Sequence, residues 1–259
     1  MIPNPIHRVL SIFRSCEVRA LLMGGQACVF YGGAEFSRDT DFAILAAAEN
    51  LQRLRRALAE LEAEVIAVPP LSLEHLERGH AVHFCCRHPE AVGMRVDVMA
   101  KMRGVDSFEQ LWQRRTTLEA EDGTKYELLA LPDLVKAKKT QRDKDWPMIR
   151  RLIEADHVAC GLHPTDAQLC FWFKEARTPS LLKELATRHP ELARALLPER
   201  REVLDAVLKS GQTDIEEALA LEERRERLAD RAYWEPLKKE LEILRRVNAT
   251  PPSSRGEAS

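Results

Sequence analysis

The pattern of apolar and polar positions divides the chain into an N-terminal part that mixes helical and strand periods and a C-terminal part with helical periods only. Residues 51–64 space their leucines by three or four positions with charges between them, as an amphipathic helix does. Residues 81–87 and 94–99 alternate with the two-residue period of strands, and the turn between them predicts an antiparallel hairpin. From residue 163 to residue 247 the helical period prevails, and the heavy charge of residues 219–231 favours the solvated face of a long helix.

The same periods predict the other elements. Helices are expected over residues 6–22, 25–31, 72–77, 107–115 and 133–140, and strands over residues 36–45, 65–68 and 125–130. Together these elements predict an α+β, α/β-like fold with a mixed sheet flanked by helices. We assign it to residues 1–157, followed by a helical domain at 158–248 and a disordered tail at 249–259.

Composition and charge narrow the classes of function. The 259 residues carry a net charge of −2, whereas a surface built wholly for nucleic acid needs a clear basic excess. No stretch approaches 18 consecutive apolar residues, and the N-terminus lacks the pattern of a signal peptide. These features predict a cytoplasmic protein with no membrane partner, and its six cysteines, which form no CxxC pair, are expected to be reduced and mostly buried.

Two aspartates separated by one residue, Asp39 and Asp41, lie within the strand expected at residues 36–45. Side chains at positions i and i+2 of a strand project from the same face, so the two carboxylates are presented together. Mg²⁺ prefers oxygen ligands, usually one or two carboxylates together with substrate phosphates. We therefore predict that Asp39 and Asp41 are metal ligands.

A pair of glycines and a third aspartate complete the candidate site. Phosphate oxygens approach the free N–H groups of a helix N-terminus closely only where side chains are absent, so Gly24 and Gly25 are predicted to contact a triphosphate. In the expected hairpin Asp97 shares a strand face with Arg95. Asp97 is either a third carboxylate for the metal or one half of an exposed ion pair with Arg95.

The combination resembles the signature of the nucleotidyltransferase superfamily, with its DNA polymerase beta-like minimal fold. There hG[GS] opens a helix, Dh[DE]h lies on the next strand and a third carboxylate follows on a later strand. Three segments match: MGG at 23–25, DTDF at 39–42, with Thr40 where an aliphatic residue is usual, and RVDVM at 95–99. More narrowly, residues 6–157 are similar to AbiEii-related bacterial proteins of this fold, through YG at 31–32, SRD at 37–39, LPDL at 131–134 and RDKD at 142–145.

The resemblance implies Mg²⁺-dependent transfer of a nucleoside monophosphate from an NTP to an acceptor hydroxyl, with release of pyrophosphate. It implies that Asp39, Asp41 and Asp97 hold one or two Mg²⁺ ions and act in catalysis, and that Arg38 neutralises triphosphate charge. The acceptor stays open among a small molecule, a tRNA and a protein. A second class also stays open, a catalytically silent binding or regulatory module such as an antitoxin-like partner in a toxin–antitoxin system, because a fold does not fix a function.

A basic run at residues 136–144 adds candidate ligands for phosphate. Helical spacing would place Lys138 and Arg142 on one side, where they are predicted to contact the nucleotide; the alternative is a solvated helix face. His83, on the first strand of the hairpin, would line the same pocket if its strand pairs with that of Asp97 in a suitable register.

Overall fold

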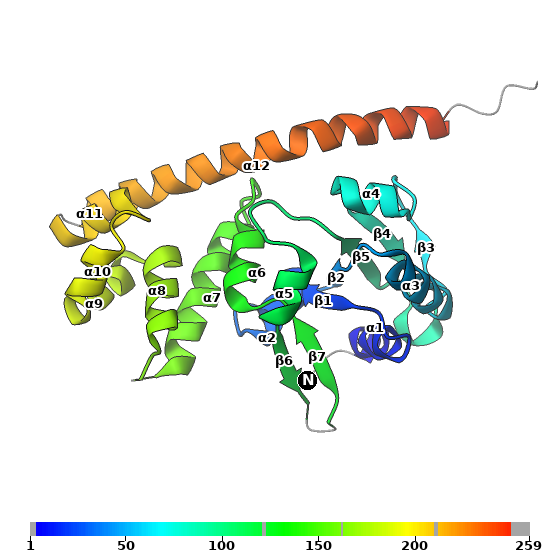
Figure 1. Ribbon diagram of the computed structural model, residues 1–259, viewed down its shortest axis with the longest axis horizontal. Coiled ribbons are helices and arrows are strands. Elements are labelled where there is room, and N and C mark those ends of the chain that lie inside the picture. The colour runs from blue at the N-terminus through cyan, green and yellow to red at the C-terminus, as the bar shows by residue number, and fades with distance from the viewer. Residues whose placement is uncertain (1–3, 121–122, 162, 210–211, 250–259) are drawn as a thin grey trace, which may run out of the picture.

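A computed structural model describes residues 4–120, 123–161, 163–209 and 212–249, and it contains a seven-stranded mixed sheet beside a group of helices (Figure 1). The fold class predicted from the sequence is confirmed. Along the sheet the strands follow the order β3-β4-β5-β2-β1-β7-β6, in which β2 pairs antiparallel with β1 and parallel with β5. The strands are β1 (Ala20–Met23), β2 (Asp39–Ile44), β3 (Glu64–Val65), β4 (Val82–Cys85), β5 (Arg95–Met99), β6 (Thr116–Glu119) and β7 (Lys125–Leu128).

The helices flank the sheet and continue beyond it. The sheet region contains α1 (Asn4–Ser15), α2 (Gly24–Phe30), α3 (Ala48–Glu60), α4 (Leu73–Arg78), the 3-10 turn η1 (Pro89–Ala91), α5 (Phe108–Gln113) and α6 (Leu131–Lys138). Beyond it follow α7 (Asp145–Cys160), α8 (Asp166–Glu175), α9 (Pro179–Arg188), α10 (Pro190–Ala195), α11 (Arg201–Lys209) and α12 (Gln212–Ala249). Since α7 runs through residue 157, the predicted division into domains falls inside a continuous helix.

Strand β2 has one apolar face and one acidic face. Phe42 stacks on Phe13 of α1 with ring centroids 4.3 Å apart, and Leu54 of α3 is fully buried in the same core. Because side chains alternate along a strand, the carboxylates of Asp39 and Asp41 point to the face opposite Phe42. Packing of the apolar face therefore fixes the direction in which the carboxylates project.

The expected helix at residues 6–22 is wrong in its second half. Helix α1 ends at Ser15, and β1 enters the sheet between β2 and β7, with Leu22 opposite both Phe42 and Leu128. The run Ala20–Met23 is apolar and short, and such a run has no period that separates a strand from a buried helix. The edge strand β6, which pairs antiparallel with β7, was also not expected from the sequence.

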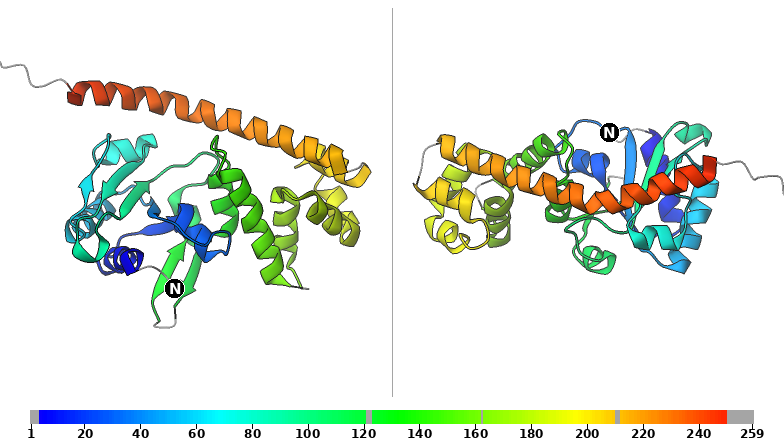
Figure 2. Two further views of the ribbon diagram at one scale, coloured as in Figure 1. Left: turned by 180° about the vertical axis from the view of Figure 1, so that it is seen from behind. Right: turned by 90° about the horizontal axis from the view of Figure 1, so that it is seen from above.

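Helix α12 joins the two parts of the molecule. It has 38 residues and passes from the group α8–α11 across the sheet region, as the orange to red helix of Figures 1 and 2 shows. Two of its leucines, Leu219 in its first half and Leu237 in its second half, are buried. Among the described helices, none is both long and apolar enough to cross a membrane. The tail expected at 249–259 lies outside the described residues except for its first residue, the last of α12.

Candidate functional site

The strand register brings the three predicted carboxylates to one face of the sheet. Met23 of β1 lies opposite Asp41 of β2, Asp41 lies opposite Asp97 of β5, and Asp97 lies opposite His83 of β4. Side chains in one such row project to the same face, and Asp39 projects to it from the neighbouring row. His83 therefore pairs with Asp97 in a register that places the His83 side chain on the same face as the carboxylates.

A cavity of about 810 Å³ lies over these carboxylates. It is lined by all eight residues predicted from the sequence to form the site: Gly24, Gly25, Arg38, Asp39, Asp41, Asp97, Lys138 and Arg142. Helix α12 closes the opposite side with Asp230, Trp234, Lys238 and Leu241. One cavity is thus lined by every predicted site residue, although these residues come from segments far apart in the chain.

The glycine pair is required by its contact with the second aspartate. Gly24 has a φ of +65°, and a Cβ there would lie 1.9 Å from Oδ2 of Asp41. The N–H of Gly25 donates to the same oxygen at 3.4 Å, and a Cβ on Gly25 would lie 2.5 Å from Oγ of Ser37. The start of α2 therefore packs directly on Asp41, which accounts for the glycines independently of any phosphate.

The surroundings of Asp41 destabilise the charged form of its carboxylate. Burial raises its pKa above the ordinary value, and the negative charges of Asp97 and Asp39 raise it further, whereas Lys138 and the Gly25 N–H oppose the shift. Like charges held together in a desolvated place repel each other unless a cation joins them. The donor set, three oxygen-bearing carboxylates, fits a divalent cation of the Mg²⁺ type.

Asp97 is turned toward its neighbours on the sheet. Its Oδ1 lies 2.9 Å from Nδ1 of His83, without the direction of a hydrogen bond, and its Oδ2 lies 3.7 Å from Nη2 of Arg95. The side chain of Asp97 is 17% exposed and that of Arg95 is 46% exposed, so the pair exists but its acidic member is largely covered. In the part of the chain that the structure describes, no three acidic, histidine or cysteine side chains already surround a common metal position.

The predicted shared helix face for Lys138 and Arg142 is wrong. Helix α6 ends at Lys138, and Arg142 lies in the turn before α7. The two cations meet instead at Asp145, whose oxygens are 3.3 Å from Lys138 Nζ and 2.7 Å from Arg142 Nε. Lys138 is buried and Arg142 is exposed. Lys138 is therefore a counter-ion beneath the site, and Arg142 stands at its edge.

Several cations line the cavity without an acidic partner. Arg38, Lys136, Lys144 and Lys238 are exposed, and none of them makes an ion pair with another described residue. By contrast, Lys139 is paired with Glu175 at 2.7 Å and Arg103 with Glu226 at 2.6 Å. The cavity thus has acidic side chains at its floor, and at its rim it has basic side chains that form no ion pair with another described residue.

Residues of α12 form part of the site that sequence reasoning missed. Asp230 is buried and accepts hydrogen bonds from the Gln141 N–H at 2.8 Å and from Trp234 Nε1 at 3.1 Å. The charges of residues 219–231 were expected on a solvated face, yet several of them point inward. Gln141 and Asp230 lie 89 positions apart, and no local pattern marks the contact.

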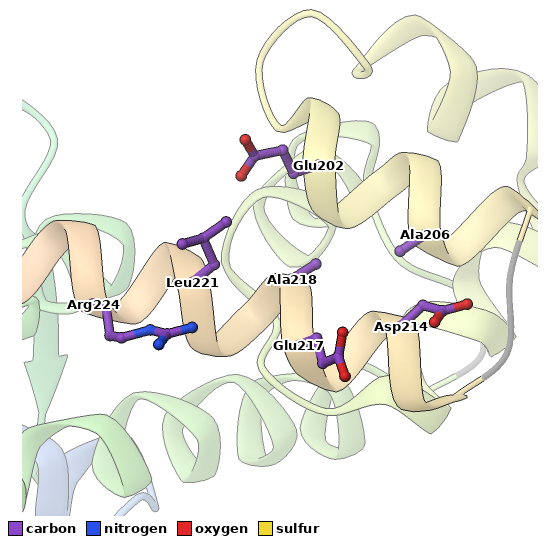
Figure 3. A pocket seen from close by; sticks show the side chains of 7 residues that line it. All are labelled: Glu202, Ala206, Asp214, Glu217, Ala218, Leu221 and Arg224. Carbon is purple, nitrogen blue, oxygen red and sulfur yellow. The ribbon is translucent and has the colours of Figure 1, made fainter.

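A second hollow, of about 560 Å³, lies between α11 and α12 and contains none of the predicted site residues. Figure 3 shows Glu202 of α11 beside the apolar Leu221 of α12, with Glu217 and Asp214 further along α12 toward Ala206. It is lined by Glu202, Ala206, Asp214, Glu217, Ala218, Leu221 and Arg224. Its acidic side chains do not lie together on one face as the three carboxylates of the first cavity do, so we assign no chemistry to this hollow.

No protein-family model matches the chain, and no curated protein matches it either. The function has therefore to be inferred from the geometry of the site. Three carboxylates on one sheet face, beneath a rim of free cations, suit a ligand that joins a divalent cation to a polyanion.

Proposed function

We propose that the protein is a Mg²⁺-dependent nucleotidyltransferase, which moves a nucleoside monophosphate from an NTP to an acceptor hydroxyl and releases pyrophosphate. The observation that carries the proposal is the placement of Asp39, Asp41 and Asp97 on one sheet face at the floor of the cavity. The resemblance of the segments around these residues to the nucleotidyltransferase signature supports it. The acceptor is a small molecule, a tRNA or a protein, and the neutral overall charge favours the first and last of these.

The three carboxylates would hold the metal. The raised pKa of Asp41 supports this role, because burial and then the like charges of Asp97 and Asp39 make its charged form costly when no cation is bound. Bound Mg²⁺ would supply charge neutralisation at the leaving pyrophosphate and acidify the acceptor hydroxyl. Asp97, which projects from a separate strand, is suited to the acceptor side.

The protein's own cations would bind and orient the triphosphate. Arg38 immediately precedes Asp39, and Lys144 and Arg142 stand on the turn before α7, so their charges reach the cavity from two sides. Lys138 acts differently, since it neutralises the buried Asp145 and lowers the cost of charge on Asp41. Gly25 already donates to Asp41, so we assign the phosphate contacts mainly to the cations.

Calorimetric titration of the whole chain with each NTP tests the coupling between metal and nucleotide. We expect affinity to strengthen markedly when Mg²⁺ replaces EDTA, and this gain to disappear in Asp41→Asn. Asp166→Asn, an exposed aspartate of α8 outside the cavity, is the matched control and should keep the gain. Equal affinity with and without Mg²⁺ would show that the carboxylates are not a metal site.

Transfer itself is tested with labelled NTP, Mg²⁺ and cell extract. We expect Asp97→Asn to lower turnover on the order of 10²-fold while nucleotide affinity changes much less, because the group acts on the reaction rather than on binding. Near wild-type turnover in this variant would remove Asp97 from the mechanism.

The alternative is a catalytically silent binding module. It is favoured by the turn of Asp97 toward His83 and Arg95 and by the use of the Gly25 N–H within the protein. Metal-dependent NTP binding with no label in any fraction of the extract would support this alternative over the transferase.

A further inference from the structure

A histidine nitrogen and a carboxylate oxygen meet in the cavity without a hydrogen bond between them. Nδ1 of His83 lies 2.9 Å from Oδ1 of Asp97, and both residues line the cavity. Both atoms are buried, and neither has a hydrogen-bond partner among the described residues. Leaving a buried polar atom without a partner costs free energy. One group that binds both atoms would remove this cost for the two together.

The separation of the two atoms is that of neighbouring ligands of one metal ion. Ligand oxygens of a small octahedral dication lie about 2.0–2.1 Å from it, and an imidazole nitrogen lies at about the same distance from a transition-metal ion. Two such ligands at a right angle are therefore about 2.8–3.0 Å apart, and the measured 2.9 Å falls in this range. A hydrogen bond can have the same length, but it also needs an N–H directed at the oxygen, and the pair lacks that direction.

The sheet presents these two side chains together with the second aspartate. Asp97 lies opposite Asp41 in the β2–β5 pair and opposite His83 in the β4–β5 pair, so the three side chains form a row across three strands. The neighbours of His83 on β4 are buried, which fixes the face from which its ring projects. Arg95 lies 3.7 Å from the other oxygen of Asp97, Oδ2. That contact engages Oδ2 and leaves Oδ1 to act with His83.

The two atoms can be reached from the cavity. The side chain of His83 is 33% exposed and that of Asp97 is 17% exposed, and the ring torsion of a histidine is soft, so a small turn of the ring opens both atoms to the cavity. Two protein ligands are enough for such a position, because substrate phosphates and water complete the shell of many protein-bound dications. The turn of Asp97 toward His83, which favoured a silent module, then becomes part of the metal centre.

We propose that Nδ1 of His83 is a ligand of the metal centre beside Asp97, and that this position prefers a first-row transition-metal dication such as Mn²⁺ to Mg²⁺. Mn²⁺ accepts carboxylate oxygens and, as a transition-metal ion, imidazole nitrogen, whereas Mg²⁺ keeps to oxygen ligands. Asp39 and Asp41 remain an all-oxygen position that suits Mg²⁺. The inference rests on the proposed function, because the transfer reaction supplies the reason for a cation beside Asp97.

Pulsed electron paramagnetic resonance of Mn²⁺ bound to the whole chain tests the ligand directly, because a nitrogen bound to the ion couples to its unpaired electrons. We expect nitrogen coupling in the wild-type chain and none in His83→Ala. His83→Gln keeps a polar side chain on the strand, which guards against a folding defect, and it should also lack the coupling. His163→Ala, at an exposed histidine outside the cavity, is the matched control and should keep it.

Calorimetric titration with each cation alone tests the preference. We expect His83→Ala to weaken Mn²⁺ binding about tenfold or more and Mg²⁺ binding much less; equal weakening for the two cations would contradict the preference. Mn²⁺ bound by the wild-type chain without nitrogen coupling, or coupling that persists in His83→Ala and His83→Gln, would overturn the inference and leave the transferase proposal standing. A wild-type chain that binds neither cation, with or without NTP, would overturn both.

Discussion

At the residue scale, the contact between Gly24 and Asp41 sets the shape of the candidate site. Gly24→Ala places a methyl group on the Asp41 carboxylate at a position with positive φ. Gly104→Ala is the matched control, because Gly104 has a φ of +69° and open space around it. We expect the control to lose about 1–2 kcal/mol of unfolding free energy, and Gly24→Ala to lose a further amount of about 1–3 kcal/mol. Denaturant titration measures both.

A second substitution separates the clash from the backbone strain. In the double variant Gly24→Ala with Asp41→Ala the carboxylate oxygen 1.9 Å from the added methyl group is gone and only the Cβ of residue 41, at 2.7 Å, still obstructs it, so the loss should fall part of the way toward that of the control. Equal losses for Gly24→Ala and Gly104→Ala would show that the contact with Asp41 has no energetic weight.

Lys138 is the second residue with a testable role. Its ammonium group neutralises Asp145, which is buried, so Lys138→Met leaves that carboxylate with Arg142 and Thr140 as its side-chain partners among the described residues. We expect a loss of about 1–3 kcal/mol in unfolding free energy, the usual cost of an unsatisfied buried polar group. Lys136→Met, two positions earlier and exposed, should stay within about 0.5 kcal/mol of wild type. Similar thermal denaturation of the two variants would contradict this assignment.

At the element scale, α12 is attached to the sheet region through Glu240. Arg78 Nε donates to Glu240 at 2.9 Å, and His80 Nε2 lies 2.9 Å from the other carboxylate oxygen. The hydrogen bond from Arg78, with a further contribution from His80, lowers the pKa of Glu240 to about 2. A carboxylate with a lowered pKa stabilises the fold above its unfolded pKa, and this contribution is lost as pH falls toward the folded value.

The prediction concerns Glu240→Gln. Near neutral pH the variant should be less stable than wild type by up to about 1 kcal/mol, since the side chain is partly exposed and its ion pairs are screened. The difference should shrink between pH 4.5 and pH 2, the ordinary and the lowered pKa of this group. Glu242→Gln, on the exposed side of the same helix, gives the baseline. A difference that does not change with pH in denaturant titrations would exclude the ion pair as its cause.

Elements with a clear period could be predicted from the sequence, and short apolar ones could not. The alternation around Asp41 and Asp97 identified β2, β4 and β5, because one face of each is buried and the other is not. Strand β1 has no such alternation in its four residues, and its identity depends on pairing with Phe42 and Leu128. Tertiary contact decides such segments.

At the scale of the whole molecule, Asp230 connects α12 to the turn that carries Arg142. It accepts the backbone N–H of Gln141 in that turn and the indole N–H of Trp234 in the helix. We expect Asp230→Ala to lower hydrogen-exchange protection in residues 139–144 and 226–241 together, while α8–α11 stay unchanged. Glu242→Ala is the control and should change neither segment. Loss of protection in only one of the two segments would contradict the coupling.

The side of the candidate site that the sheet forms could be predicted from the sequence, and the side that α12 forms could not. The sequence predicts Asp39, Asp41 and Asp97 as site residues because each lies in a short local pattern that is typical of metal-binding carboxylates. The position of His83 required the strand register, which the sequence does not encode locally. The contribution of Trp234 depends on the path of α12 across the molecule, and no short segment specifies a contact over such a separation.

Because α12 is long, a small rotation at its end near α8–α11 would produce a larger displacement at its end near the cavity. Glu222 is held by Arg177 and Arg200 at one end, and Glu240 is held by Arg78 at the other. These two glutamates are about 27 Å apart along a helix that rises 1.5 Å per residue. A rotation of α12 by about six degrees around Glu222 would therefore move Glu240 by roughly 3 Å. Such a tilt exceeds the reach of the hydrogen bond from Arg78. A rotation of this size would also displace Lys238 and Leu241, the neighbours of Glu240 that line the cavity.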